Sequence, residues 1–169
     1  MNWTNLWITN IYSYAPGGGG PGGGLINDVL KVGGWGDWYF SLIKFNLPNE
    51  RDEASFAGIL LFVRDSEHET VPVFVDRIIE RWKWDLTQHI WWRDRPGSFP
   101  IVTDSLPAPE KNHWYVVEIT KLYNQWINRS AENFGVQIRP ATNYGSFIEF
   151  TSSKAPDRTK APSLLVCRQ

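Results

Sequence analysis

The chain is poor in the features that mark several large classes of protein. It has one cysteine, Cys167, among 169 residues, so no disulfide can form within it. No apolar run approaches the ~20 residues of a membrane span. The first residues lack the basic and apolar segments of a secretory signal. The net charge of -1 gives no electrostatic reason to expect nucleic acid or an anionic membrane as a partner.

Motifs that carry catalytic or metal chemistry are also missing. The sequence has no GxSxG nucleophile elbow, no HExxH pair and no glycine-rich phosphate loop between a strand and a helix. The best metal candidates are Asp65, Glu67 and Glu69, which lack the spacing of an EF-hand loop. We therefore expect a protein that is not an enzyme and that needs no cofactor, with a structural calcium as an open alternative.

Glycine and tryptophan, by contrast, are abundant. Residues 16–24 are mostly glycine, and ordering such a stretch is entropically expensive, so we expect a glycine-rich surface loop there. Ten tryptophans are a large excess for a chain of this length. Aromatic rings bury ~150–250 Å² each in protein cores, and they also stack on sugar rings, so composition alone does not separate the two uses.

The rest of the chain has the pattern of an all-β domain. Short runs rich in Val, Ile, Phe, Tyr and Trp alternate with turn residues. Residues 120–128 break that pattern with apolar side chains at helical spacing, and Thr120 is the expected N-cap. We expect one domain over residues 1–169, folded as a two-sheet sandwich or a barrel. The expected strands are 28–32, 39–47, 57–64, 71–79, 113–119, 134–140, 146–152 and 163–167.

Five separate stretches resemble the signatures of one family. They are "SLIKFNLP" (41–48), "ASFAGILLFV" (54–63), "WDLTQHIWWRDRP" (84–96), "VEITKLYNQWINRSAENFGVQIRP" (117–140) and "FTSSKAPDRTKAPSLLV" (150–166). In order and spacing they are similar to the DNRLRE-domain family, jelly-roll proteins of which some are classed as carbohydrate-binding modules. The resemblance implies a jelly-roll β-sandwich of two antiparallel sheets, used for attachment or glycan recognition. Lys154 stands where relatives usually have an acidic residue, so no role is carried over to that position.

Strand parity sorts the tryptophans of residues 82–92, because neighbouring residues of a strand face opposite sides. The resemblance places Trp92 in the core, so Trp91 should face outward if both lie in a strand. Trp84 also matches a tryptophan that the family buries. Trp82 shares the face of Trp84 in an extended segment, so we expect it at the margin of the core.

The same test predicts a second group of exposed rings. Trp38 and Phe40 lie opposite the face of Ile43 and Phe45, and Trp35 lies in a glycine-rich turn. An exposed aromatic cluster generally marks a binding surface. These rings could instead cover an open end of the fold or a partner subunit.

We therefore predict a binding or adhesion module that recognises polysaccharide through exposed aromatic side chains. The alternative is a head, tail or decoration protein of a phage virion or surface assembly, whose aromatics contact other subunits. Either protein would be extracellular or on a virion surface. The residues expected to contact the glycan or the partner are Trp91, Trp35, Trp38, Phe40, Arg93, Asp94, Asn143 and Tyr144.

Overall fold

The computed structural model describes most of the chain. The described residues are 6–13 (backbone only), 29–47, 52–67, 71–82, 92–101, 104–153 and 155–168. The glycine-rich segment 16–24 lies outside them. Among the described residues, no helix has the length and apolar character that crossing a membrane requires.

The described residues form ten strands and one α-helix, α1 (Thr120–Ile127). All eight strands expected from the sequence are present, and β1 and β6 are additional. The expected helix is also present. The strands are β1 (Leu6–Ser13), β2 (Val29–Gly34), β3 (Trp38–Phe45), β4 (Phe56–Glu67), β5 (Val73–Ile78), β6 (Ser98–Pro100), β7 (Trp114–Glu118), β8 (Val136–Pro140), β9 (Ser146–Thr151) and β10 (Ser163–Cys167).

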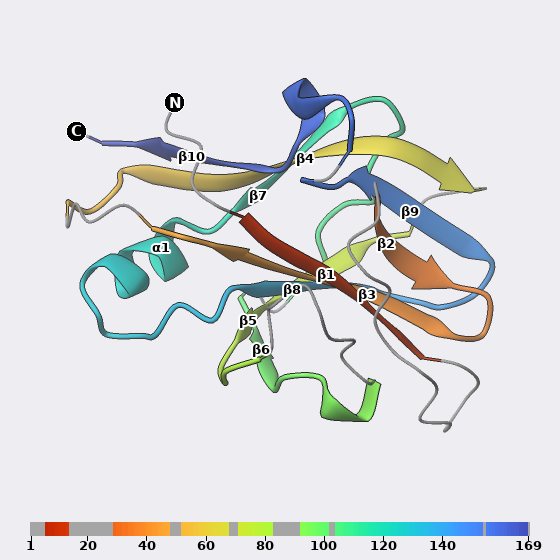
Figure 1. The fold of residues 1–169 in the computed structure, drawn as a ribbon, viewed down its shortest axis with the longest axis horizontal. Helices are drawn as coiled ribbons and strands as arrows, with labels where there is room; N and C mark the ends of the chain where they lie inside the picture. Colours follow the sequence, from red (N-terminus) through yellow and green to blue (C-terminus); the bar gives the residue numbers. More distant parts are fainter. Residues whose placement is uncertain are drawn as a thin grey trace.

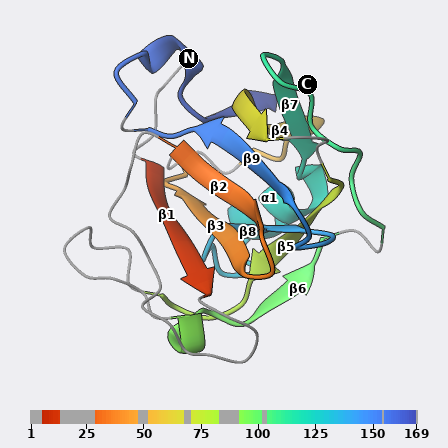
Figure 2. The ribbon, with the colours of Figure 1, turned by 90° about the vertical axis from the view of Figure 1, so that its right-hand side faces the viewer.

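The strands pair in one antiparallel path, in the order β10-β4-β9-β2-β3-β8-β5-β6, with β1 on β3 and β7 on β4. The long strand β4 changes neighbours along its length. Its first half pairs with β10 and β7, and from Val63 onward it pairs with β9. A register shift between Val63 and Asp65 marks a bulge, which bends a strand. The all-β prediction is thus confirmed as a curled antiparallel sheet (Figure 1; Figure 2).

The main core lies on the inner face of this curled sheet, and α1 closes it at one end (Figure 1). The helix buries Leu122, Tyr123, Trp126 and Ile127, which recur at helical spacing. Burying four such side chains is the main reason that a helix of only eight residues forms here.

Side chains of α1 also bond to the start of β4. Asn124 accepts a hydrogen bond from the backbone N–H of Ala54 at 2.8 Å and donates one to its carbonyl at 3.0 Å. The Thr120 hydroxyl accepts from the N–H of Ala57 at 3.0 Å. The expected N-cap role of Thr120 is therefore wrong: Ile119 is the N-cap, without a side-chain bond, and Thr120 serves β4 instead.

A second hydrophobic cluster covers the opposite face of β3. Phe40, Leu42, Ile78 and Trp82 are buried in it, and Trp38, Trp92 and Phe134 pack against it. Parity is therefore confirmed, because Phe40 lies opposite Ile43 and Phe45 of the main core. The predicted exposure of Phe40 is wrong, because Ile78 and Trp82 cover its face of the strand, and Trp38 is half-buried.

Two of the four tryptophans in residues 82–92 are described. Trp82 is buried, as expected, and its indole N–H donates to the carbonyl of Phe134 at 2.7 Å. Trp92 is partly buried against Phe40, with ring centroids 4.8 Å apart. It lies in a 3₁₀ turn, Trp92–Asp94, so strand parity does not apply to it. Trp84 and Trp91 lie outside the described residues.

Two glycines with nearly equal positive φ provide a matched pair for testing backbone packing. Gly135 has φ +92°, and a Cβ added there would lie 2.2 Å from the carbonyl oxygen of Ile43 on β3. Gly36 has φ +95°, and nothing lies within 4 Å of an added Cβ. The positive φ disfavours any other residue at both positions. Only at Gly135 would an added Cβ also collide with a neighbouring strand.

We expect Gly36→Ala to lower the free energy of unfolding by about 1–3 kcal/mol, the usual cost of a strained backbone angle. Gly135→Ala should lower the free energy of unfolding by more than about 4 kcal/mol, a loss that few single substitutions cause, because β8 must also move away from β3. Urea unfolding of both variants measures the difference. Equal losses would show that the contact with Ile43 contributes nothing.

Candidate functional site

Two turns that are far apart in the sequence meet at one end of the sheet. Residues 35–37 join β2 to β3, and residues 141–145 join β8 to β9. The backbone N–H of Gly36 donates to the carbonyl of Asn143 at 2.8 Å, which fixes one turn against the other. We call the surface formed by Trp35, Asn143, Tyr144 and Phe147 the hairpin tip.

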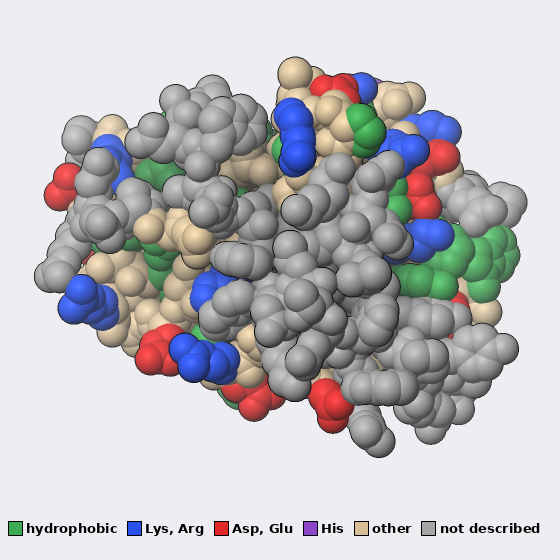
Figure 3. All heavy atoms as spheres, viewed as in Figure 1, with side chains coloured by type: hydrophobic (Ala, Val, Ile, Leu, Met, Phe, Trp, Pro, Cys, Tyr) green, Lys and Arg blue, Asp and Glu red, His purple; other side chains and the backbone are tan. Residues whose placement is uncertain are grey.

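Two large rings are exposed at the hairpin tip. Trp35 is 52% exposed and Tyr144 81%. A Cβ added at Gly145 would lie 3.5 Å from the Trp35 ring, so this backbone supports the indole. Phe147 meets Trp35 edge to face, with centroids 6.2 Å apart. Hydrophobic side chains gather over this end of β2, β3 and β9, at the right of the view in Figure 3.

Polar and charged groups surround these rings. The carboxylate of Asp37 accepts from the backbone N–H of Trp35 at 2.7 Å. Lys31 lies over the Phe147 ring, 4.7 Å from its centroid, and 3.3 Å from the carboxylate of Glu149. The face of an aromatic ring is electron-rich and attracts the C–H groups of a sugar ring. The hairpin tip therefore has both the apolar and the hydrogen-bonding groups that a sugar requires.

The predicted site residues thus divide into separate groups. Trp35, Asn143 and Tyr144 come together at the hairpin tip. Trp38 and Phe40 belong to the second cluster and Asp94 is exposed in the 3₁₀ turn. Trp91 and the side chain of Arg93 lie outside the described part of the chain.

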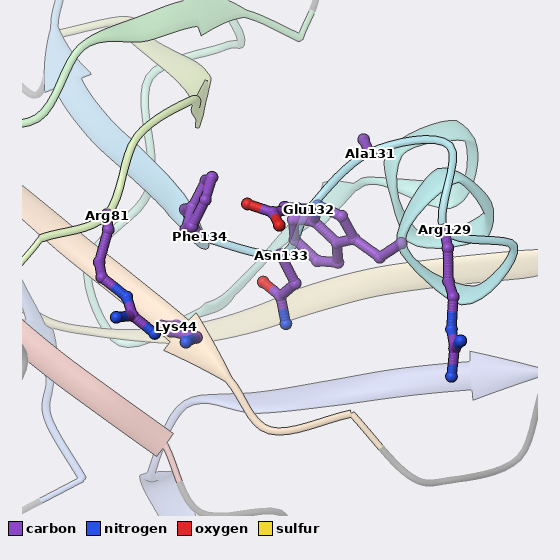
Figure 4. A pocket seen from close by; sticks show the side chains of 8 residues that line it. Lys44, Arg81, Arg129, Ala131, Glu132, Asn133 and Phe134 are labelled. Carbon is purple, nitrogen blue, oxygen red and sulfur yellow. The ribbon is translucent and has the colours of Figure 1, made fainter.

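A cavity that the sequence analysis did not predict opens near the far end of β3. It has a volume of about 730 Å³, and we call it the basic pocket. It lies between the end of β3, the end of β5 and the segment that follows α1 (Figure 4). No local motif could have revealed it, because its cations come from three separate elements. The residues that line it are Lys44, Arg81, Trp126, Arg129, Ala131, Glu132, Asn133 and Phe134.

The charges of the basic pocket favour an anionic group. Figure 4 shows Lys44 and Arg81 on one side and Arg129 on the other, with Glu132 between them. Burial, followed by the charge of Arg81, lowers the pKa of Lys44 below its ordinary value. A lowered lysine pKa means that the charged ammonium is disfavoured here, and a bound anion would relieve that cost.

The metal candidates are only partly described. Asp65 lies on β4, and its carboxylate is 2.5 Å from the ammonium of Lys111. The hydrogen bond from Lys111, with one from the N–H of Ser66, lowers the pKa of Asp65. The side chain of Glu67 and the whole of Glu69 lie outside the described residues. Among those that the structure describes, no three His, Cys, Asp or Glu residues are grouped as a metal site.

Comparison with protein families identifies a relative of this chain. The sequence profile of carbohydrate-binding module family 96 matches residues 30–167, which include both turns of the hairpin tip and all residues of the basic pocket. No curated protein matches the chain.

Removing the charge of Arg81 tests the electrostatics of the basic pocket. In Arg81→Gln we expect the pKa of Lys44 to rise, because one of the two causes that lower it is gone. NMR titration of the lysine side-chain signals measures this value. Arg158→Gln, a change at a distant 3₁₀ turn, should leave it unchanged. An unchanged Lys44 pKa in Arg81→Gln would show that the two cations do not interact.

Proposed function

Because the chain belongs to carbohydrate-binding module family 96, we propose that it binds polysaccharide, without catalysis, at the hairpin tip. The observation that carries the proposal is the exposure of Trp35 and Tyr144 beside polar groups. Aromatic rings make good contact surfaces because they are large and rigid and lose little conformational entropy on binding. The turns are already bonded to each other, so little ordering is needed before binding.

The basic pocket is proposed as a second contact, for an acidic sugar. Its support is the grouping of Lys44, Arg81 and Arg129, and among the described residues that line it the one acid is Glu132. The strand β3 runs from the hairpin tip to this pocket, and its eight residues span roughly 26 Å at ~3.3 Å each. One ligand could reach both sites only as a polymer.

We also propose the jelly-roll sandwich and the kinship with the DNRLRE-domain family. Support comes from β4, which pairs with β10 and β7 before its bulge and with β9 after it, as a strand shared by two sheets would. We also propose an extracellular location and an adhesion role, and the only support for them is the proposed polysaccharide ligand. The family match gives no support to the virion alternative or to virion subunits as partners.

Substitution of one ring tests the assignment of the hairpin tip. We expect Trp35→Ala to weaken polysaccharide binding at least tenfold, about 1.4 kcal/mol, because loss of a central aromatic contact commonly costs more than 1 kcal/mol. Affinity electrophoresis against a panel of neutral and acidic polysaccharides, followed by calorimetry, measures the change. Tyr144→Ala should act in the same direction.

The matched control is Phe99→Ala on β6, since Phe99 is 57% exposed and not part of the hairpin tip. This variant should bind like the unchanged chain. Equal losses in both variants, or a loss in neither, would sink the site assignment. Shortening of any polysaccharide in the panel during incubation would contradict the non-catalytic function.

A further inference from the structure

Arg129 has a backbone conformation that disfavours its own residue type. Most of the described residues with a positive φ are glycines, which have no Cβ to collide with the backbone. Asn112, at φ 62°, is not a glycine, but asparagine tolerates this left-handed region better than most residues. Arg129, at φ 64°, is the other exception among the described residues, and an arginine side chain offers no such compensation. The presence of an arginine at this position therefore needs a reason.

The end of α1 fixes this conformation. The backbone N–H of Arg129 donates to the carbonyl of Trp126 at 3.3 Å, a bond typical of helix ends whose left-handed residue is glycine. The N–H of Ala131 donates to the carbonyl of Gln125 at 3.1 Å, so the chain turns back on the helix directly after Arg129. A glycine at position 129 would allow the same turn with less strain. The backbone alone thus favours glycine, and the reason for an arginine lies in its side chain.

The side chain of Arg129 lines the basic pocket, and the residue is exposed (Figure 4). Among the residues that the structure describes, its guanidinium has no hydrogen bond or ion pair. Arginines with a structural role differ in this respect. The Nε of Arg139 lies 2.8 Å from the carboxylate of Asp76. The guanidinium of Arg158 donates to the carbonyl of Ser153. The Arg129 side chain therefore remains available to a ligand of the pocket.

We propose that Arg129 binds an anionic group of the ligand in the basic pocket, and that the chain tolerates a strained turn to hold it there. This role rests on the proposed second contact with an acidic sugar and names a residue that makes it. A guanidinium holds a carboxylate or a sulfate through two parallel hydrogen bonds, which the ammonium of Lys44 cannot do. The volume of about 730 Å³ is in the range of pockets that hold small ligands.

Arg129 provides one of two positive regions in the basic pocket. Figure 4 shows Arg129 on one side, Glu132 in the middle and the other two cations beyond it. The carboxylate of Glu132 repels an anion placed midway, so anionic groups bind best at the two ends. A polymer with acidic groups on successive sugars can occupy both regions, whereas a single acidic sugar occupies one of them. The hydrogen-bonded turn holds the backbone of Arg129 in place before binding, which lowers the entropic cost of the contact.

Affinity electrophoresis with dextran sulfate and with polygalacturonate tests this role, because one probe carries sulfates and the other carboxylates. Arg129→Gln should weaken binding to the preferred probe roughly tenfold or more, the usual effect of losing a charged hydrogen bond. Its binding should also depend less on salt. Arg129→Lys keeps the charge but not the paired hydrogen bonds, so its affinity should be intermediate. Arg158→Gln, the same change at a distant 3₁₀ turn, is the matched control and should bind like the unchanged chain.

Urea unfolding of Arg129→Gly separates the contact from the backbone strain. Glycine removes both the guanidinium and the strain, whereas glutamine removes only the guanidinium. Both variants should bind the acidic probes equally weakly, and Arg129→Gly should unfold at a higher urea concentration than Arg129→Gln.

Two results would overturn the role of Arg129 alone. One is a glutamine or glycine variant that binds the acidic probes like the unchanged chain, and the other is a glycine variant no more stable than the glutamine variant. If the unchanged chain binds neither probe, the second contact fails and the role of Arg129 fails with it. Binding through Trp35 is measured on neutral polysaccharides, so the hairpin tip stands or fails separately.

Discussion

The segment that follows α1 fixes the position of β3, on which both candidate glycan surfaces depend. The amide of Asn133 donates to the carbonyl of Phe45 at 2.8 Å and accepts from the N–H of Gly135 at 3.0 Å. The carbonyl of Gly135 in turn accepts from the N–H of Ile78, at the end of β5. These bonds require the close approach of Gly135 to Ile43, which only a glycine allows.

The same segment contributes to both the second hydrophobic cluster and the basic pocket. The carbonyl of Phe134 accepts the indole N–H of Trp82, which satisfies the one polar group of that buried ring. The Phe134 side chain packs against the second cluster and also lines the pocket beside Lys44. The packing of the second cluster and the shape of the basic pocket are therefore coupled through Phe134. A substitution that loosens the cluster should also displace this side chain of the pocket.

The sequence predicts the strands well, because a two-residue period is a local signal, and it assigns the two faces of β3 correctly. Whether a side chain is exposed depends on residues that are distant in the sequence. Phe40, for example, is buried in a cluster with Trp82. Trp92 lies in a 3₁₀ turn, which the family resemblance could not distinguish from a strand. The basic pocket was not predictable for the same reason, since Lys44 and Arg81 meet only in the folded chain.

The exposed rings of this protein differ in what surrounds them, and this difference decides what each can bind. The backbone N–H of Trp35 donates to the carboxylate of Asp37, and the neighbouring Phe147 carries the ammonium of Lys31 over its face. A ligand there can replace its hydrogen bonds to water. Trp114 likewise meets a ring that carries an ammonium, because Lys160 lies over the face of Phe62. What distinguishes Trp35 is the second turn bonded to its own, which adds the 81% exposed ring of Tyr144 to the same surface.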